Sequence, residues 1–358
     1  MVGVFFITLN MIDYIIVGSG LAGIAFAETG INHNKTILVF DNDSQNSSKI
    51  AAGLYNPVIL KRFSEVFGAK YQMELLDVFY KTIEDKLSIV CDNKLPIYRK
   101  FFSIEEQNNW FAASDKPNLK EYLLAKIVTK KYDCIDSPYG YGEVLHTGYV
   151  DTMVLLDNYK KYLLTKNRYV KATFVYSEIV FNEDYVRYKD ILAKHIVFAE
   201  GFGMHANPFF NYLPLDGTKG ELLIIKAPKL NLDVIVNTSV FIVPLGNDLF
   251  KIGATYNWED KTNTPTEEGK QELIVRIQEI ITCDFEIVSH FAGVRPTVKD
   301  RKPMIGTHKN HQRLHILNGL GTRGVMLAPA MAKDLFDSIE KTKPLDKSID
   351  IIRFDKKV

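Results

Sequence analysis

Apolar residues recur along the chain in two ways, and together they predict an α/β protein. Continuous apolar runs, which are typical of buried strands, occur at Asp13–Val17, Thr36–Phe40, His195–Ala199 and Leu314–Leu317. Segments with helical spacing or helix-forming composition occur at Leu21–Glu28, Tyr71–Leu87, Asp151–Leu164, Glu267–Ile281 and Val325–Lys341. The strand–helix–strand order near the N-terminus is that of a βαβ unit, so it predicts a parallel sheet.

Other segments alternate apolar and polar residues, the pattern of antiparallel strands with one solvated face. A meander that leads into His195–Ala199 is predicted by Tyr169–Phe174, Glu178–Phe181 and Tyr185–Tyr188. A second sheet is predicted by Glu221–Ile225, Val234–Val236, Val240–Val243 and Leu249–Ala254. Residues Glu121–Glu143 are mixed in pattern, and no element is assigned to them.

The chain returns to the predicted parallel sheet near its C-terminus, which indicates two interleaved domains. We expect residues 11–52, 143–210 and 292–345 to form a Rossmann-like domain around this sheet. We expect residues 53–142 and 211–291 to form a smaller α+β domain on a mostly antiparallel sheet. The first ten residues, MVGVFFITLN, precede a buried strand that begins just after Met11. We therefore expect residues 1–10 to be a weakly ordered upstream-start extension.

Composition narrows the class of protein. The 358 residues are 46% hydrophobic and 24% charged, which is ordinary for a folded chain of about two domains. The net charge of +1 gives no overall attraction to nucleic acid or to anionic membranes. No apolar stretch reaches the ~20 residues that a membrane span needs. Cys91, Cys134 and Cys283 show no CxxC spacing, which favours reduced thiols and a cytoplasmic location.

A glycine-rich turn between the first strand and the first helix carries the first chemical signal. It reads Gly18-Ser19-Gly20-Leu21-Ala22-Gly23, and Asp41 ends the next predicted strand. In a dinucleotide site Gly18 makes the tight turn, Gly20 lets the backbone approach the pyrophosphate, and Gly23 packs helix against strand. Asp41 would accept from the ribose hydroxyls and would repel an NADP phosphate. This signal alone leaves NAD and FAD open.

The second signal lies in the C-terminal part of the chain and favours FAD. The stretches AGVRPTVKDRKPMIG and GLGTRGVMLAPAMA follow DYIIVGSGLAG, SSKIAAGL, GYVD, IVFAEGFG, PLDGTKGELL, FIVPLG and GATY. In these stretches and their order the chain resembles the D-amino-acid oxidase family of flavoproteins. The AGVRP and KDRKPMIG segments resemble glycine oxidases. GATY and GLGTRG are more similar to the FAD oxidase domain of the bifunctional enzyme that modifies wobble uridine in tRNA.

The resemblance implies roles for single residues. Arg295 matches the arginine that grips the substrate carboxylate, a task that suits its planar, bidentate fork. That grip would place the reacting C–H roughly 3–3.5 Å from flavin N5. Arg323 and Tyr256 are further candidates for the substrate site. Contacts with FAD are implied, besides the glycine turn and Asp41, for Ser48, Gly53, Gly201, Gly319, Gly321 and Gly324. Glu200 departs from the family's small residue, and its charge beside a pyrophosphate would be unfavourable.

The cysteines and three histidines bear on covalent flavin attachment and on metal binding. Covalent flavin attachment in some family members uses a cysteine near the segment of Arg295; Cys283 lies too far upstream, so we expect noncovalent FAD. His308, His311 and His315 have spacing that a metal site could use, but their segment is a polar loop that enters a strand without a neighbouring cysteine. We expect no metal.

The leading hypothesis is a flavoenzyme that oxidises the C–N bond of an amino acid or secondary amine to an imine, which water hydrolyses. Its partner would be a small molecule, and the electron acceptor and oligomeric state are left open. An alternative is oxidation of the carboxymethylaminomethyl group of wobble uridine in tRNA, which the near-neutral charge does not favour. A nicotinamide-dependent dehydrogenase and a non-catalytic flavoprotein subunit are further alternatives. The former would leave the GVRP and GLGTRG segments without a role.

Overall fold

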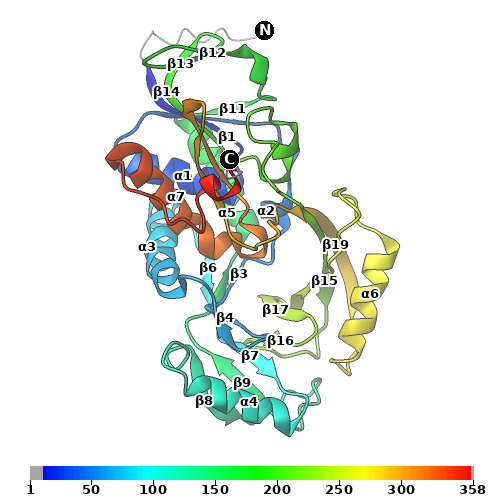
Figure 1. The fold of residues 1–358 in the computed structure, drawn as a ribbon. Coiled ribbons are helices and arrows are strands. Elements are labelled where there is room, and N and C mark those ends of the chain that lie inside the picture. The colour runs from blue at the N-terminus through cyan, green and yellow to red at the C-terminus, as the bar shows by residue number, and fades with distance from the viewer. Residues whose placement is uncertain (1–10, 356–358) are drawn as a thin grey trace. The chain divides into compact units, whose positions relative to one another are not determined.

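The computed structural model describes residues 11–355, so the expected extension at residues 1–10 lies outside the described part. The chain forms two compact units (Figure 1). The first contains the chain up to Asn46, Leu156–Gly217 and the chain from Pro296 onward, and the second contains Ser47–Leu155 and Thr218–Arg295. Within residues 11–355, no helix combines the length and apolarity needed to cross a membrane.

An eight-stranded sheet forms the centre of the first unit. Its strands are β1 (Ile12–Val17), β2 (Ile37–Asp41), β11 (Tyr169–Lys171), β12 (Ile179–Phe181), β13 (Val186–Tyr188), β14 (Ile191–Phe198), β20 (Met304–His308) and β21 (His311–Asn318). The neighbours β11–β2–β1–β14–β21 are all parallel, whereas β12, β13 and β20 pair antiparallel. The apolar run of β1 is buried over its last four residues, as a central parallel strand requires.

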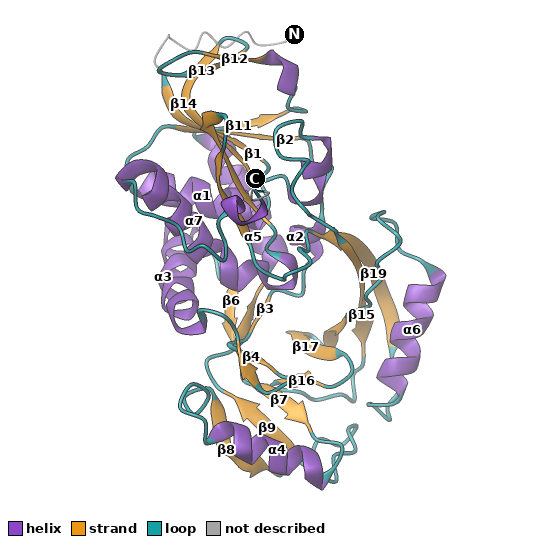
Figure 2. Ribbon diagram, in the orientation of Figure 1, coloured by secondary structure: helices purple, strands orange, loops and turns teal. Residues whose placement is uncertain are grey.

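Two long helices of the first unit, α1 (Leu21–Asn32) and α7 (Gly324–Lys341), pack against each other beside the sheet (Figure 2). Phe26 of α1 and Phe336 of α7 meet there, with ring centroids 6.2 Å apart. Another helix, α5 (Thr152–Thr165), enters this unit at Leu156 and leads to β11. Short 3-10 turns complete the unit: η1 (Tyr176–Glu178), η2 (Gly201–Ala206), η3 (Gly321–Arg323) and η4 (Ile351–Phe354).

One predicted pairing is wrong. Tyr169–Phe174 was expected to begin an antiparallel meander, but only β12 and β13 join β14 in that way. Instead, Tyr169, Val170 and Lys171 pair in parallel with β2. The physical reason is where the preceding helix leads: α5 follows β10, a strand of another sheet, and delivers the chain to the edge of β2, so β11 pairs there and not with β12.

A mixed, mostly antiparallel sheet of eight strands forms the centre of the second unit. In spatial order the strands are β19 (Glu286–Arg295), β15 (Thr218–Lys226), β18 (Leu249–Gly253), β17 (Phe241–Gly246), β16 (Ile235–Asn237), β7 (Ile97–Lys100), β9 (Tyr141–Val144) and β8 (Leu123–Val128). Only the β16–β7 pair is parallel in this described sheet. The unassigned stretch Glu121–Glu143 therefore contains β8 and the start of β9.

The remaining elements of the second unit flank this sheet. Two small sheets consist of β3 (Leu54–Tyr55), β10 (Gly148–Val150) and β6 (Asp92–Lys94), and of β4 (Val58–Ile59) and β5 (Ser64–Glu65). The helices are α2 (Ser47–Ile50), α3 (Ala69–Leu87), α4 (Ile104–Ser114) and α6 (Glu267–Gln278). Helix α6 lies along β15 (Figure 1), and Leu273 and Ile277 of α6 join the core that Leu223 and Ile252 form on this sheet. The predicted α/β fold is confirmed, with one sheet that is parallel at its centre and a second that is mostly antiparallel.

Candidate active site

The glycine turn after β1 has a backbone that only glycine can form. Gly18 has a φ of +103°, and a Cβ on it would lie 2.4 Å from the carbonyl oxygen of Ala199. A Cβ on Gly23 would lie 1.8 Å from the carbonyl oxygen of Gly18, so helix α1 can approach the turn only with glycine there. Gly20 is the N-cap of α1. The three glycines thus bring the amino end of α1 onto the end of β1, as a dinucleotide turn requires.

Asp41 lies beside this turn at the end of β2. Its Oδ2 accepts from the backbone N–H of Ser19 at 2.5 Å, and its Oδ1 accepts from the N–H of Asp43 at 2.6 Å. Each carboxylate oxygen has two lone pairs, so these bonds leave capacity for ribose hydroxyls. Asp41 and the glycine turn therefore lie next to each other in the structure. The contact of Asp41 with ribose stays a prediction.

Two more glycines of the first unit expose their backbone. Gly201 and Gly321 both have a φ of +55°, and a Cβ on either would have nothing within 4 Å. Gly319 differs, because a Cβ there would lie 2.7 Å from Cγ2 of Val298, and Gly324 begins α7. Open, left-handed backbone at Gly201 and Gly321 fits a large cofactor that must approach the main chain closely. The residues of this unit therefore fit FAD.

Glu200 is turned away from solvent and bonded. Its carboxylate accepts from the hydroxyl of Tyr176 at 2.5 Å and from Nδ2 of Asn207 at 2.7 Å. Burial raises the pKa of Glu200 to about 7 even though both bonds favour the charged form. Next to it, Nδ2 of Asn318 donates to the carbonyl of Gly201 at 2.9 Å. The carboxylate of Glu200, whose charge would be unfavourable beside a pyrophosphate, is thus hydrogen-bonded by polar side chains of the first unit.

Arg295 ends β19 in the second unit, and three groups surround its guanidinium. Nη1 donates to the carbonyl of Thr255 at 3.3 Å, and the guanidinium carbon lies 4.7 Å from the ring centroid of Tyr256. A Cβ on Gly220 would lie 1.8 Å from Nη2, so Gly220 makes the room for this side chain. Burial lowers the pKa of Arg295. Asp300, five residues further along the chain, accepts from Nε of Arg353 at 3.0 Å.

The other predicted site residues lie in different elements. Arg323 is half-buried in η3 directly before α7 in the first unit. Ser48 lies in α2, which packs on β19 in the second unit. Gly53 has a φ of +76°, and a Cβ there would lie 1.9 Å from the carbonyl of Val150, so close packing on β10 requires this glycine. Their contacts with substrate or FAD stay predictions.

The three histidines considered for a metal have other contacts. His315 is buried in β21, where its Nε2 lies 2.9 Å from Nδ1 of His195 and its Nδ1 lies 2.9 Å from the hydroxyl of Thr307. The rings of His308 and His311 stack with centroids 4.9 Å apart. Burial lowers the pKa of His195 to about 4 and holds that of His315 well below its usual range, so both are neutral near pH 7.

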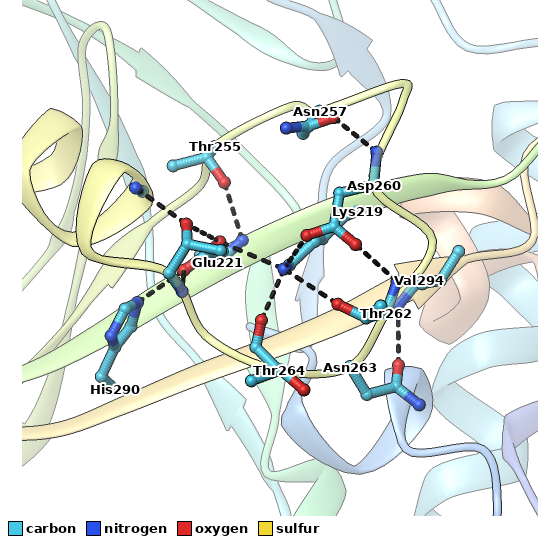
Figure 3. A network of polar contacts seen from close by, with 12 residues as sticks. Lys219, Glu221, Thr255, Asn257, Asp260, Thr262, Asn263, Thr264, His290 and Val294 are labelled. Carbon is cyan, nitrogen blue, oxygen red and sulfur yellow. Dashed lines mark hydrogen bonds and ion pairs between the residues drawn. The ribbon is translucent and has the colours of Figure 1, made fainter.

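Sequence reasoning missed a buried polar network behind Arg295. Lys219 and Glu221 of β15 are both buried and contact the loop that carries Tyr256 (Figure 3). In an alternating strand a lysine and a glutamate two residues apart predict a solvated face, so the sequence pattern gave no sign of their burial.

Comparison with known proteins agrees with this arrangement. The family model described as FAD dependent oxidoreductase matches residues 13–338. The chain belongs to this family of FAD-dependent oxidoreductases. A glycine oxidase of Bacillus subtilis is 22% identical over 96% of this chain and 97% of that enzyme. The tRNA 5-methylaminomethyl-2-thiouridine biosynthesis bifunctional protein of Legionella pneumophila is 24% identical over 44% of this chain and 23% of that protein.

The fold is that of solved family members. The crystal structure of glycine oxidase from Geobacillus kaustophilus superposes with a TM-score of 0.80 at 18% identity, covering 95% of this chain and 97% of that chain. The family match makes the protein an FAD-dependent enzyme. It therefore sets aside the nicotinamide-dependent dehydrogenase, which the glycine turn alone had left open, and the non-catalytic flavoprotein subunit.

Proposed function

We propose that this enzyme oxidises the C–N bond of an amino acid or carboxylate-bearing secondary amine to an imine, which water hydrolyses to an oxo acid and ammonia or a smaller amine. The proposal rests on the groups that lie around the guanidinium of Arg295. The half-buried guanidinium lies between Gly220 and the ring of Tyr256, and a substrate carboxylate would bind it with two parallel hydrogen bonds. Similarity to glycine oxidase supports the same substrate class.

The residues of the first unit would hold FAD, which supplies the acceptor for the hydride that leaves the substrate carbon. Gly18, Gly20 and Gly23 would bring backbone amides to the pyrophosphate, and Asp41 would accept from the ribose. Gly201 and Gly321 would let the cofactor lie against bare backbone. We propose noncovalent binding, because the segment around Arg295 contains no cysteine. The cytoplasmic location is proposed from the three cysteines, none of which is in a disulfide.

A test begins with the visible spectrum of the purified protein. The oxidised flavin bands are then followed anaerobically during addition of glycine, sarcosine, D-amino acids or tRNA bearing carboxymethylaminomethyl-uridine. Bleaching by one small amine that is lost in Arg295→Met, and kept in Arg313→Met, would support the proposal. Arg313 is a matched control because its guanidinium donates to the backbone carbonyl of Glu183. Bleaching that survives Arg295→Met would refute the role of Arg295.

Oxidation of a modified tRNA uridine is a second candidate, supported by the match to the bifunctional tRNA enzyme of Legionella pneumophila. The carboxymethylaminomethyl group carries a carboxylate beside a secondary amine, so Arg295 could bind it in the same way. Bleaching by this tRNA, with an affinity that falls steeply as salt rises, would favour this candidate over a free amino acid.

A further inference from the structure

The two faces of strand β15 carry different residues. Side chains alternate along a strand, so Lys219 and Glu221 point to one face while Thr218 and Gly220 point to the other. Thr218 pairs with Arg295 of the neighbouring antiparallel strand, and directly paired residues share a face. Arg295 thus lies on the Gly220 face, and the polar network lies directly behind it.

Lys219 ties the middle of the loop 255–266 to the back of β15. Its side chain is 1% exposed. Its ammonium donates to Oδ2 of Asp260 at 2.5 Å, to the carbonyl of Thr264 and to the hydroxyl of Thr262 at 3.4 Å (Figure 3). Its backbone exchanges two hydrogen bonds with Asn257, of 2.9 and 3.0 Å. An ammonium has three N–H donors, and all three find acceptors here, which makes burial of the charge tolerable.

Glu221 ties down the two ends of the same loop. At the start, its N–H donates to the hydroxyl of Thr255 at 2.9 Å, and its carbonyl accepts from the N–H of Thr255 at 3.3 Å. At the end, its carboxylate accepts from the N–H and the hydroxyl of Thr266, at 3.0 and 2.8 Å. Thr266 is also the N-cap of helix α6. The loop is therefore bound to β15 at its start, middle and end.

The loop carries two groups that contact the guanidinium of Arg295. The carbonyl of Thr255 accepts from Nη1, and the ring of Tyr256 lies over the guanidinium. Because Asn257 pairs with Lys219, Tyr256 points to the opposite face, toward Arg295. Displacement of the loop would move both groups and would leave Arg295 free to adopt other rotamers.

We propose that Lys219 is a positioning residue: by binding Asp260 and Thr264 it fixes the loop 255–266 and so holds the guanidinium of Arg295 in place for a carboxylate. This inference rests on the proposed role of Arg295. It assigns Lys219 no contact with substrate. The expected consequence is a loss of affinity for the carboxylate group alone, since other parts of a ligand would not sense the orientation of the guanidinium.

The test uses the FAD-loaded enzyme and two probes of equal size, propionate and propionamide. Dissociation constants are measured by quenching of tryptophan fluorescence, which does not depend on turnover, and Trp258 lies on the loop itself. In Lys219→Met, propionate should bind at least about tenfold more weakly, the scale of one charge-assisted hydrogen bond, while propionamide is unchanged. Asp260→Asn, on the more exposed side of the same ion pair, should act in the same direction and serves if Lys219→Met does not fold.

Lys261→Met is the matched control, since it removes a positive charge from the same loop while leaving the contacts of Lys219 in place. Its ammonium donates to the carbonyl of Trp258, and both dissociation constants should stay unchanged. Arg295→Met is measured alongside. A preference for propionate that survives Arg295→Met would overturn the proposed function. The positioning role alone would be overturned if Arg295→Met abolishes the preference for propionate while Lys219→Met and Asp260→Asn leave it intact. It would also be overturned if Lys219→Met weakens the binding of both probes equally.

Discussion

Replacement of Glu200 by glutamine should make the enzyme more stable at alkaline pH relative to the wild type. Burial raises the pKa of Glu200 from 4.5 to about 7, which corresponds to about 3 kcal/mol between the two protonation states. A carboxyl with a raised native pKa stabilises the fold fully below its unfolded pKa, and this contribution is lost as pH rises from about 4.5 to 7. Glutamine carries no charge at any pH and therefore lacks this loss.

The assay is urea unfolding of both proteins between pH 4.5 and 8. The difference in unfolding free energy, Glu200→Gln minus wild type, should rise by about 3 kcal/mol across this range. A constant offset of about 1–2 kcal/mol against the variant is expected as well, because glutamine has one acceptor oxygen where the carboxylate accepts from both Tyr176 and Asn207. Glu183→Gln, at an exposed position of the same unit, controls for general charge effects. A difference that does not change with pH would refute the reasoning.

Three further predictions concern the glycine turn, Arg295 and His195. Gly23→Ala places a Cβ 1.8 Å from the carbonyl of Gly18, so we expect about 1–3 kcal/mol lower stability and a reduced ratio of bound flavin to protein, read from absorbance. Gly220→Ala should displace the guanidinium of Arg295 and weaken propionate binding about tenfold with the melting temperature nearly unchanged; normal binding would contradict the described packing. The native pKa of His195, about 4, makes the wild type lose about 3 kcal/mol of unfolding free energy as pH falls from 6.5 to 4. His195→Gln should lack this loss, which unfolding curves at pH 4 and 7 measure.

The parallel sheet could be predicted because its signals are local. The apolar run of β1, the glycine turn and the alanine-rich helix lie within about twenty residues, and each constrains the next through backbone geometry. The direction of β11 could not be predicted in this way. A three-residue strand carries too short a pattern to show which strand it pairs with or in which direction.

Helix α4 begins at a local sequence signal. Ser103 caps this helix by accepting from the N–H of Glu106 at 3.1 Å, and a serine three residues before a glutamate is a known start signal. Glu106 does not return a bond to the N–H of Ser103; its carboxylate pairs with Arg99 and accepts from the N–H of Phe102. Here tertiary contacts changed the local motif, although the helix still begins where the serine indicates.

The polar residues that matter most to the site were the hardest to predict, for one physical reason. A buried charge is tolerated only where several partners converge, and those partners come from distant parts of the chain. Lys219 meets residues about 40 positions later, and Glu200 is bonded by Tyr176 and Asn207 from both sides. Local patterns show glycines and apolar strands because these act on their neighbours in sequence. The groups that hold Glu200 and Arg295 in place act through space, so only the folded structure brings them together.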